Sequence, residues 1–167
     1  MADVVKDALS LLEKDKSVWS ETYRKAREDL EFQSDDQFAQ WDAKDFQARA
    51  ETGRPALTID QLSQFVHQVE NDIRMNTPAI EVIPADNQSN AETSEIFRGL
   101  IKAIEYHSQA DDAYDLASSF AVRCGIGFLR VDHDYVSETE GFEQELRIKR
   151  VTNPLSVYID SDTREAG

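Results

Sequence analysis

The sequence feature that most constrains the fold is a change of hydrophobic period across Gly125-Ile126-Gly127. Before these glycines, Leu116, Phe120 and Cys124 recur every four residues, which is the spacing of one helix face. After them, Leu129–Tyr135 alternates with the two-residue period of a β-strand. A helix that runs directly into a strand needs a sheet for that strand to join. We therefore expect this passage to lie where the layers of the fold meet.

The strand has a predicted partner in Phe142–Val151, where aliphatic side chains again alternate with charged ones. The register that places the apolar side chains of both strands on one face pairs Val131 with Ile148 and His133 with Leu146. A shift of one residue would turn the charged side chains toward the core. The same register places Asp132 opposite Arg147 on the exposed face, which favours an ion pair. We therefore predict an antiparallel hairpin over residues 127–151, with Glu138–Gly141 as its loop.

Three helices are predicted in the first third of the chain. The first has Asp3 as its cap and is interrupted at Lys14–Ser17. The second carries an apolar stripe at helical spacing: Trp19, Tyr23, Ala26 and Leu30. This spacing favours packing over stacking of Trp19 on a base or ligand. The third is short, carries the aromatic residues Phe38, Trp41 and Phe46, and ends at Gly53 and Pro55.

A longer helix is predicted to start at Thr58, because Thr58 and Gln61 form a capping-box pattern. Its predicted apolar face consists of Leu62, Phe65, Val66, Val69 and Ile73. Pro78 ends this helix, and Ala79–Ile83 follows as a short predicted strand.

The next predicted helix is capped by Ser89 or Asn90. Its predicted buried face consists of Ile96, Leu100, Ile101 and Ile104. We expect a break within His107–Asp112, where Asp111 could cap a new helix. A third short strand is predicted over Val157–Ile159, followed by a polar turn.

These elements predict an α+β fold. An N-terminal helical arm over residues 1–52 precedes an α+β segment over residues 53–167. In that segment, two or three longer helices pack on a small, mainly antiparallel sheet that contains the 127–151 hairpin. The chain ends in a polar tail without a terminating element, so we expect it to be truncated at its C-terminal end.

The composition is that of a soluble, acidic globular protein. Asp and Glu number 33 against 18 Lys and Arg, which gives a formal net charge of −15. This sign disfavours tight binding to phosphate but permits a surface past which DNA slides. The single cysteine, Cys124, excludes an internal disulfide framework and fits a reducing compartment. No stretch has the length of a membrane span or the pattern of a signal peptide.

Several short motifs suggest chemistry, but a structural interpretation is favoured for each. In Asp132-His133-Asp134 the histidine of a strand points away from both aspartates, so the three do not converge on one metal ion. Gly125-Ile126-Gly127 follows a helix instead of preceding one, so it fits a helix end better than a phosphate loop. Asp160 and Asp162 fit a polar turn, and Cys124 fits a small buried residue. We predict no catalytic, cofactor-binding or metal-binding residue, no cofactor and no enzyme.

The order of short motifs along nearly the whole chain resembles the portal protein of short-tailed bacteriophages. The central part of the resemblance is Gly53–Ile59, followed by Val66, Gln68, Val69, Asn71, Asn76, Pro78, Ile80, Val82 and Pro84. Before it lie Ala26–Asp29, Phe32 and Gln40-Trp41. After it come Gly99–Ile101, Ile104–Tyr106, Ala113–Asp115, Ala121-Val122, Gly125, Gly127, Val131, Tyr135, Phe142, Ile148, Val151, Asn153-Pro154, Val157-Tyr158 and Asp160.

This resemblance implies a structural protein of the virion that assembles in the host cytoplasm. Such portals form rings, usually of twelve subunits, at one capsid vertex, where DNA enters during packaging and leaves during ejection. The implied partners are other portal subunits, terminase, tail and head-completion proteins, capsid proteins, and double-stranded DNA that passes without tight binding. No membrane is implied. The segment would correspond to the outer wing of the subunit, and the resemblance identifies no DNA-binding residues.

Two alternatives stay open at this point. One is an adaptor of a phage or prophage that binds a protein partner through its helical arm, which is favoured if Phe38, Trp41 and Phe46 are unpacked. The other is a metal-dependent, nuclease-like enzyme that uses Asp132, Asp134 and Asp160.

Overall fold

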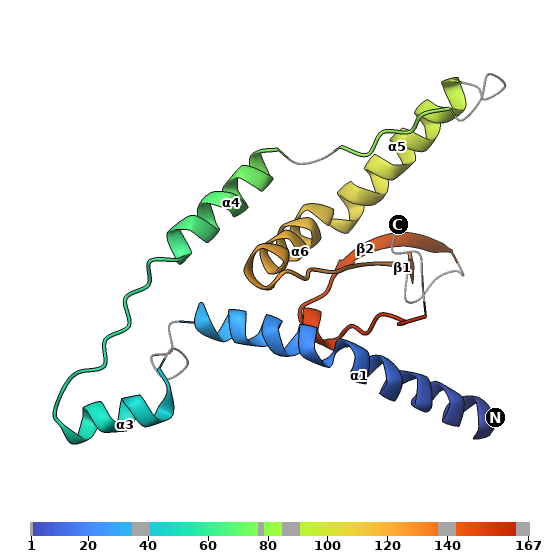
Figure 1. Cartoon of the computed structure of the whole chain (residues 1–167). Helices are drawn as coiled ribbons and strands as arrows, with labels where there is room; N and C mark the ends of the chain where they lie inside the picture. The colour runs from blue at the N-terminus through green and yellow to red at the C-terminus, as the bar shows by residue number, and fades with distance from the viewer. Residues whose placement is uncertain (1, 35–40, 77–78, 85–90, 137–142, 163–167) are drawn as a thin grey trace. The chain divides into compact units, whose positions relative to one another are not determined.

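The computed structural model describes residues 2–34, 41–76, 79–84, 91–136 and 143–162 (Figure 1). In chain order, the elements are α1 (Ala2–Phe32), α3 (Ala43–Glu51), α4 (Ser63–Met75), α5 (Ala91–Ser108), α6 (Ala110–Cys124), β1 (Leu129–Tyr135), β2 (Gln144–Arg150) and the short 3-10 helix η1 (Pro154–Ser156). Helices dominate, and β1 and β2 form a two-stranded antiparallel sheet that α5 contacts. The predicted α+β class is confirmed.

The chain divides into two compact units. The first consists of Met1–His67, Ala121–Ile126 and Asn153–Gly167, and the second of Gln68–Phe120 and Gly127–Thr152. Helices α4 and α6 each begin in one unit and end in the other. The predicted helical arm over residues 1–52 and α+β segment over residues 53–167 stay predictions.

In the first unit, α1 is one continuous helix, so the predicted interruption at Lys14–Ser17 is wrong. That stretch contains neither Gly nor Pro, and its polar side chains continue a helix at little cost. Asp3 lies inside α1 and not in front of it. The less exposed residues of α1 recur every three or four positions, and they are Leu12, Asp15, Trp19, Tyr23, Ala26 and Leu30. The predicted stripe is therefore confirmed, and it extends toward the N-terminus to Leu12.

The stripe on α1 binds the main chain of the extended segment that follows η1. The indole Nε1 of Trp19 donates a hydrogen bond to the carbonyl oxygen of Ile159 at 2.9 Å, and the hydroxyl of Tyr23 donates to that of Val157. Trp19 thus packs within the fold, as its spacing predicted. The predicted strand over Val157–Ile159 is wrong, because no strand pairs with it among the described residues.

The same segment is anchored at both of its ends. Pro154 in η1 is fully buried, and the side chain of Asn153 caps η1 by accepting the N–H of Leu155 at 3.0 Å. At the other end, the Asp15 carboxylate accepts the N–H of Ser161 at 3.1 Å and its hydroxyl at 2.8 Å. Asp15 is only 6% exposed, so these bonds satisfy a buried charge.

The two helices after α1 start at aspartate caps. The Asp42 side chain accepts the N–H of Lys44 at 2.9 Å in front of α3. Asp60 accepts the N–H of Leu62 at 2.9 Å and that of Ser63 at 3.0 Å in front of α4, which begins at Ser63, so the predicted capping box at Thr58 is wrong. A charged carboxylate also interacts favourably with the positive end of the helix dipole, which gives Asp60 an advantage over the threonine.

The ends of α3 and α4 agree with the predictions. Helix α3 stops at Glu51, and Gly53 adopts a left-handed φ of 65° that glycine accommodates without strain. Helix α4 stops at Met75. Of its predicted apolar face, Val66 is buried, whereas Phe65 is 59% exposed.

In the second unit, α4 is attached to α6 by polar contacts. The hydroxyl of Ser119 donates to the carboxylate of Glu70 at 2.6 Å, and Glu70 is only 7% exposed. Arg74 and Asp115 form an ion pair at 2.8 Å. The predicted apolar face of α4 did not include Glu70, because hydrophobic spacing alone does not identify a buried carboxylate with a hydroxyl partner.

The predicted break between α5 and α6 is confirmed. It lies at Gln109, whose φ of 50° is left-handed, and Asp111 lies in the first turn of α6 and not at its cap. The predicted caps of α5, Ser89 and Asn90, fall outside the described residues. Its predicted buried face is only partly right. Ile101 and Ile104 are half-buried, whereas Ile96 and Leu100 are exposed.

Two glycines make the connection from α6 to β1 possible, for different reasons. Gly125 ends the helix with a φ of 79°, as predicted for a C-terminal cap. Gly127 is required by close approach instead, because a Cβ there would lie 1.8 Å from the carbonyl oxygen of Ala117 in α6. The backbone at Gly127, just before β1, is thus packed against the backbone in the middle of α6.

The hairpin has the predicted register, with Val131 opposite Ile148, His133 opposite Leu146 and Asp132 opposite Arg147. Its loop, Glu138–Gly141, lies outside the described residues. The predicted exposure of the two faces is wrong. Four large side chains of the apolar face are 40–62% exposed, namely Leu129, Val131, Tyr135 and Leu146. The charged face is the more covered one, since Asp132, Asp134, Glu145, Arg147 and Lys149 are all half-buried.

The segment 79–84 is not part of the sheet, so the predicted strand over Ala79–Ile83 is also wrong. A guanidinium nitrogen of Arg98 in α5 lies 3.5 Å from the carbonyl oxygen of Val82 and from the carboxylate of Glu81. Among the described residues, no backbone group of this segment forms a ladder with another strand.

Candidate functional site

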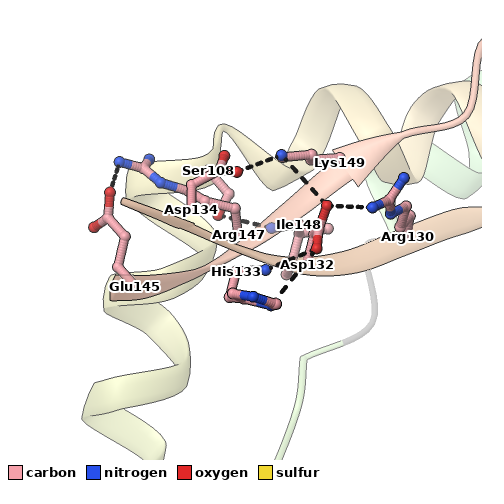
Figure 2. Close-up of polar contacts among 9 residues, drawn as sticks. All are labelled: Ser108, Arg130, Asp132, His133, Asp134, Glu145, Arg147, Ile148 and Lys149. Carbon is pink, nitrogen blue, oxygen red and sulfur yellow. Dashed lines mark hydrogen bonds and ion pairs between the residues drawn. The ribbon is translucent and has the colours of Figure 1, made fainter. Parts of the chain in front are cut away.

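The charged face of the hairpin brings together several residues that the sequence marked as candidates (Figure 2). Asp132 receives the guanidinium of Arg130 at 2.5 Å, the ammonium of Lys149 at 3.5 Å and the backbone N–H of His133 at 3.0 Å. Lys149 also binds Asp134 at 2.7 Å. Two carboxylates and two cations from neighbouring strands therefore form one network.

Two members of this network, Asp132 and Lys149, are charged at neutral pH. The N–H of His133, together with Arg130 and Lys149, holds the pKa of the Asp132 carboxyl below its ordinary value. The hydrogen bond to Asp134 raises the pKa of Lys149 above its ordinary value. A general acid or base near neutral pH needs the opposite shifts, so this geometry does not prepare either group for proton transfer.

The network does not have the geometry of a metal site. Nδ1 of His133 lies 3.8 Å from Asp132, and no group of three His, Cys, Asp or Glu side chains converges in the part of the chain that the structure describes. Asp160 belongs to the first unit, where its carboxylate accepts the N–H of Asp162 at 2.9 Å. Asp162 itself binds Lys14 at 2.7 Å, as expected for a polar turn.

The outer edge of β2 is held by the C-terminal end of α5. The hydroxyl of Ser108 accepts the backbone N–H of Ile148 at 3.0 Å, as Figure 2 shows. The guanidinium of Arg147 donates to the carbonyl oxygen of His107 and to the carboxylate of Glu145. The predicted pair between Arg147 and Asp132 is absent among the described contacts, because the unpaired carbonyls at a helix C-terminus attract the cation.

The aromatic residues of the predicted third helix are only partly within the described residues. Trp41 is half-buried, and the guanidinium of Arg49 lies 4.5 Å from the centre of its ring. Phe46 is also half-buried, and Phe38 falls outside the described residues. An adaptor surface of unpacked aromatic side chains is therefore not observed for the two residues that are described.

The second unit exposes much apolar surface. Its apolar side chains that are about half exposed or more include Ile80, Ile83, Ile96, Phe97, Leu100, Val131, Tyr135 and Leu146. A groove of about 280 Å³ lies between α4, α6 and the start of β1, lined by Ile73, Ala79, Ile80, Tyr114, Asp115, Ala117, Ser118 and Leu129. The sequence predicted buried faces for four of the exposed residues, Ile96, Leu100, Val131 and Leu146. Apolar surface of this extent is typical of a subunit that is covered by partners in an assembly.

A family model described as phage P22-like portal protein matches residues 9–166. The chain therefore belongs to the P22-like phage portal protein family, as the resemblance predicted. A search of curated proteins gave no match.

Membership of this family supplies the coarse biological setting. Portal proteins are structural, non-enzymatic components of the phage capsid and form an oligomeric ring with other phage proteins. Among the described residues, no helix combines the length and the apolar character needed to cross a bilayer.

Proposed function

We propose that this chain is the wing segment of a portal subunit, which forms a ring at one capsid vertex as a conduit for DNA packaging and ejection. The observation that carries the proposal is the family match, which extends over residues 9–166 and so over nearly the whole chain. The helices and hairpin described above would form the outer part of each subunit, with residues 1–52 as an arm.

The partners follow from that role. A ring of twelve copies docks terminase while DNA enters, and tail and head-completion proteins afterwards. Capsid proteins surround it at the vertex, and assembly takes place in the host cytoplasm.

The charge of the chain supports passage of DNA over tight binding. A net charge of −15 repels the phosphate backbone, and Arg130 and Lys149 of the hairpin are already paired with carboxylates. We propose no DNA-binding, catalytic or metal-binding residue in this segment.

The ring is tested by electron microscopy of the protein expressed from its complete reading frame. Closed rings with a central channel are expected. A protein that stays monomeric at every concentration examined would contradict the proposal.

The conduit role is tested in capsids assembled with and without the protein, by measuring the DNA that is protected from nuclease. Protected DNA is expected only when the protein is present, and equal protection in both preparations would refute the role. In a gel shift at low salt, the protein should leave duplex DNA unretarded. Tight binding there argues against a conduit that lets DNA slide.

A further inference from the structure

The outer edge of β1 carries hydrogen-bonding groups that point away from β2. The N–H of Val136 bonds to the carbonyl of Glu143 at 2.9 Å, next to the ladder of β1 and β2. Because bonded and non-bonded pairs alternate in an antiparallel ladder, the N–H and C=O groups of every second residue of β1 point outward. Those residues are Leu129, Val131, His133 and Tyr135. Among the described residues, no strand pairs with this edge.

The outer edge of β1 can accept a further strand at its N-terminal end but not in its middle. The outward N–H of His133 already donates to the Asp132 carboxylate at 3.0 Å. Among the described residues, the outward N–H and C=O groups of Leu129 and Val131 make no hydrogen bond. The opposite edge of the sheet is occupied, since Ser108 accepts the N–H of Ile148. Within the part of the chain that the structure describes, the sheet is therefore open to extension on the β1 side, beside its first residues.

The same chain contains a β-prone segment without a sheet. Residues 79–84 have the sequence Ala-Ile-Glu-Val-Ile-Pro, belong to no helix, and make no ladder with a strand among the described residues. Ile80 is 49% and Ile83 is 75% exposed. The contacts of Arg98 to Glu81 and Val82, both at 3.5 Å, lie at the outer limit of a hydrogen bond.

The segment and the edge are complementary in side-chain pattern and charge. When Ile80 and Val82 are placed on the apolar face of the sheet, Glu81 is placed on the charged face. In an antiparallel register Glu81 then lies beside Arg130, whose side chain is 65% exposed. The register pairs Val82 with Leu129, Glu81 with Arg130 and Ile80 with Val131. It ends where the Asp132 carboxylate blocks the next N–H of β1.

We propose that residues 79–83 of one copy add to the outer edge of β1 of a neighbouring copy as a third, antiparallel strand. This inference rests on the proposed ring. A ring is closed by a head-to-tail interface, which joins two different surfaces of the same chain. The β-prone segment and the outer edge of β1, neither of which pairs with a strand among the described residues, are two such surfaces. The exposed apolar side chains of the same unit require cover of this kind.

The test is a disulfide between copies that carry one introduced cysteine each. In the proposed register, residues 81 and 130 form a non-hydrogen-bonded pair, whose Cα atoms lie about 4.5 Å apart, within the range that a disulfide spans. The Glu81→Cys variant and the Arg130→Cys variant are each purified separately. The two proteins are then mixed during ring assembly and oxidised. Cys124 stays in place because it is only 6% exposed.

A cross-linked dimer in the mixture, and in neither variant alone, is the expected result. Tyr106→Cys replaces Glu81→Cys in the matched control, since Tyr106 lies on α5 and is 82% exposed. In this control, the Tyr106→Cys variant is expected to form no cross-linked dimer with the Arg130→Cys variant. A dimer of equal yield in the control would show random collision and overturn the inference.

Two further outcomes separate this inference from the proposed function. Rings without a dimer overturn the strand addition and leave the ring intact. A cross-link within one chain of the Glu81→Cys/Arg130→Cys double variant, with none in the mixture, also overturns it, because the segment then pairs with its own sheet. Dimers without any ring in the microscope support the pairing and contradict the proposed ring.

Discussion

Replacing Gly127 with alanine should destabilise the second unit more than any other single methyl group added to a described glycine. A Cβ at this position would lie 1.8 Å from the carbonyl oxygen of Ala117, and its carbon atom is only 2.7 Å away. Ordinary contact begins at 3.4 Å, so the two backbones must separate by about 1.6 Å. Neither partner is a flexible side chain. Overpacking of this kind typically costs about 1–3 kcal/mol, and a backbone–backbone overlap belongs at the upper end.

The other glycines supply matched controls in the same chain. Gly125→Ala places a methyl group in open space at a φ of 79°, so only the left-handed backbone is penalised, by about 1–2 kcal/mol. Gly99→Ala also meets nothing within 4 Å, and it lies inside α5, so it should stabilise the protein by about 0.5–1 kcal/mol.

The assay is urea unfolding followed by far-UV circular dichroism. The expected order of stability is Gly99→Ala above wild type, then Gly125→Ala, then Gly127→Ala. Because the chain contains two units, a second transition would be fitted separately. The reasoning fails if Gly127→Ala is as stable as wild type, since the close approach to α6 would then not exist.

Three further predictions concern the contacts of α1 and of the hairpin. Trp19→Phe removes the hydrogen bond to the carbonyl of Ile159 and should lower the free energy of unfolding, measured by urea unfolding, by about 1 kcal/mol. Val18→Ala, on the exposed side of α1, should change this free energy little. Equal effects of the two substitutions would contradict the contact. Asp15→Ala removes the buried acceptor of Ser161 and should lower the free energy of unfolding by about 1–3 kcal/mol. Lys14→Ala breaks only an exposed ion pair and should not change this free energy measurably. A larger loss of stability in Lys14→Ala than in Asp15→Ala would contradict the role given to Asp15. Asp132 has a lowered pKa in the folded state, so its carboxylate stabilises the fold above its unfolded pKa of about 3.9 and loses this effect as the pH falls through the lower folded value. The stability difference between wild type and Asp132→Asn should therefore shrink on acidification below about pH 4, and a constant difference would show that the charge contributes nothing.

The sequence contained enough information for the elements that depend on local chemistry. The register of the hairpin follows from alternation alone, because only one register puts Val131 opposite Ile148 on the apolar face. The helix end at Gly125 follows from glycine at a C-terminal cap, and the break near Gln109 from the loss of apolar period.

The failures are all cases in which a partner distant in sequence decides. Val157–Ile159 has strand character, but its carbonyls bind Trp19 and Tyr23, which lie over 130 positions away. Ala79–Ile83 finds no strand among the described residues, and no local signal reports that. The exposure of the hairpin faces was inverted because Arg147 binds the end of α5 instead of Asp132. Buried Asp15 and Glu70 were missed because acidic residues on a helix are usually solvated.

The candidate site was predictable in its chemistry but not in its network. Alternation on a strand argued against a metal site at Asp132-His133-Asp134. The bridging role of Lys149 between the two aspartates depends on the partner strand, and the block that Asp132 imposes on the edge of β1 depends on its rotamer. The spacing of the residues in the sequence predicts neither of these two features.

The way in which α1 holds the end of the described chain has an evolutionary consequence. An indole and a phenol there contact peptide carbonyls, which every amino acid possesses. Substitutions at Val157 and Ile159 would thus leave both bonds in place, whereas a change of Trp19 or Tyr23 removes one. Mutational constraint should accordingly fall on the helix and be relaxed along the strand-like segment it holds, so that the segment can diverge in sequence while its path is conserved.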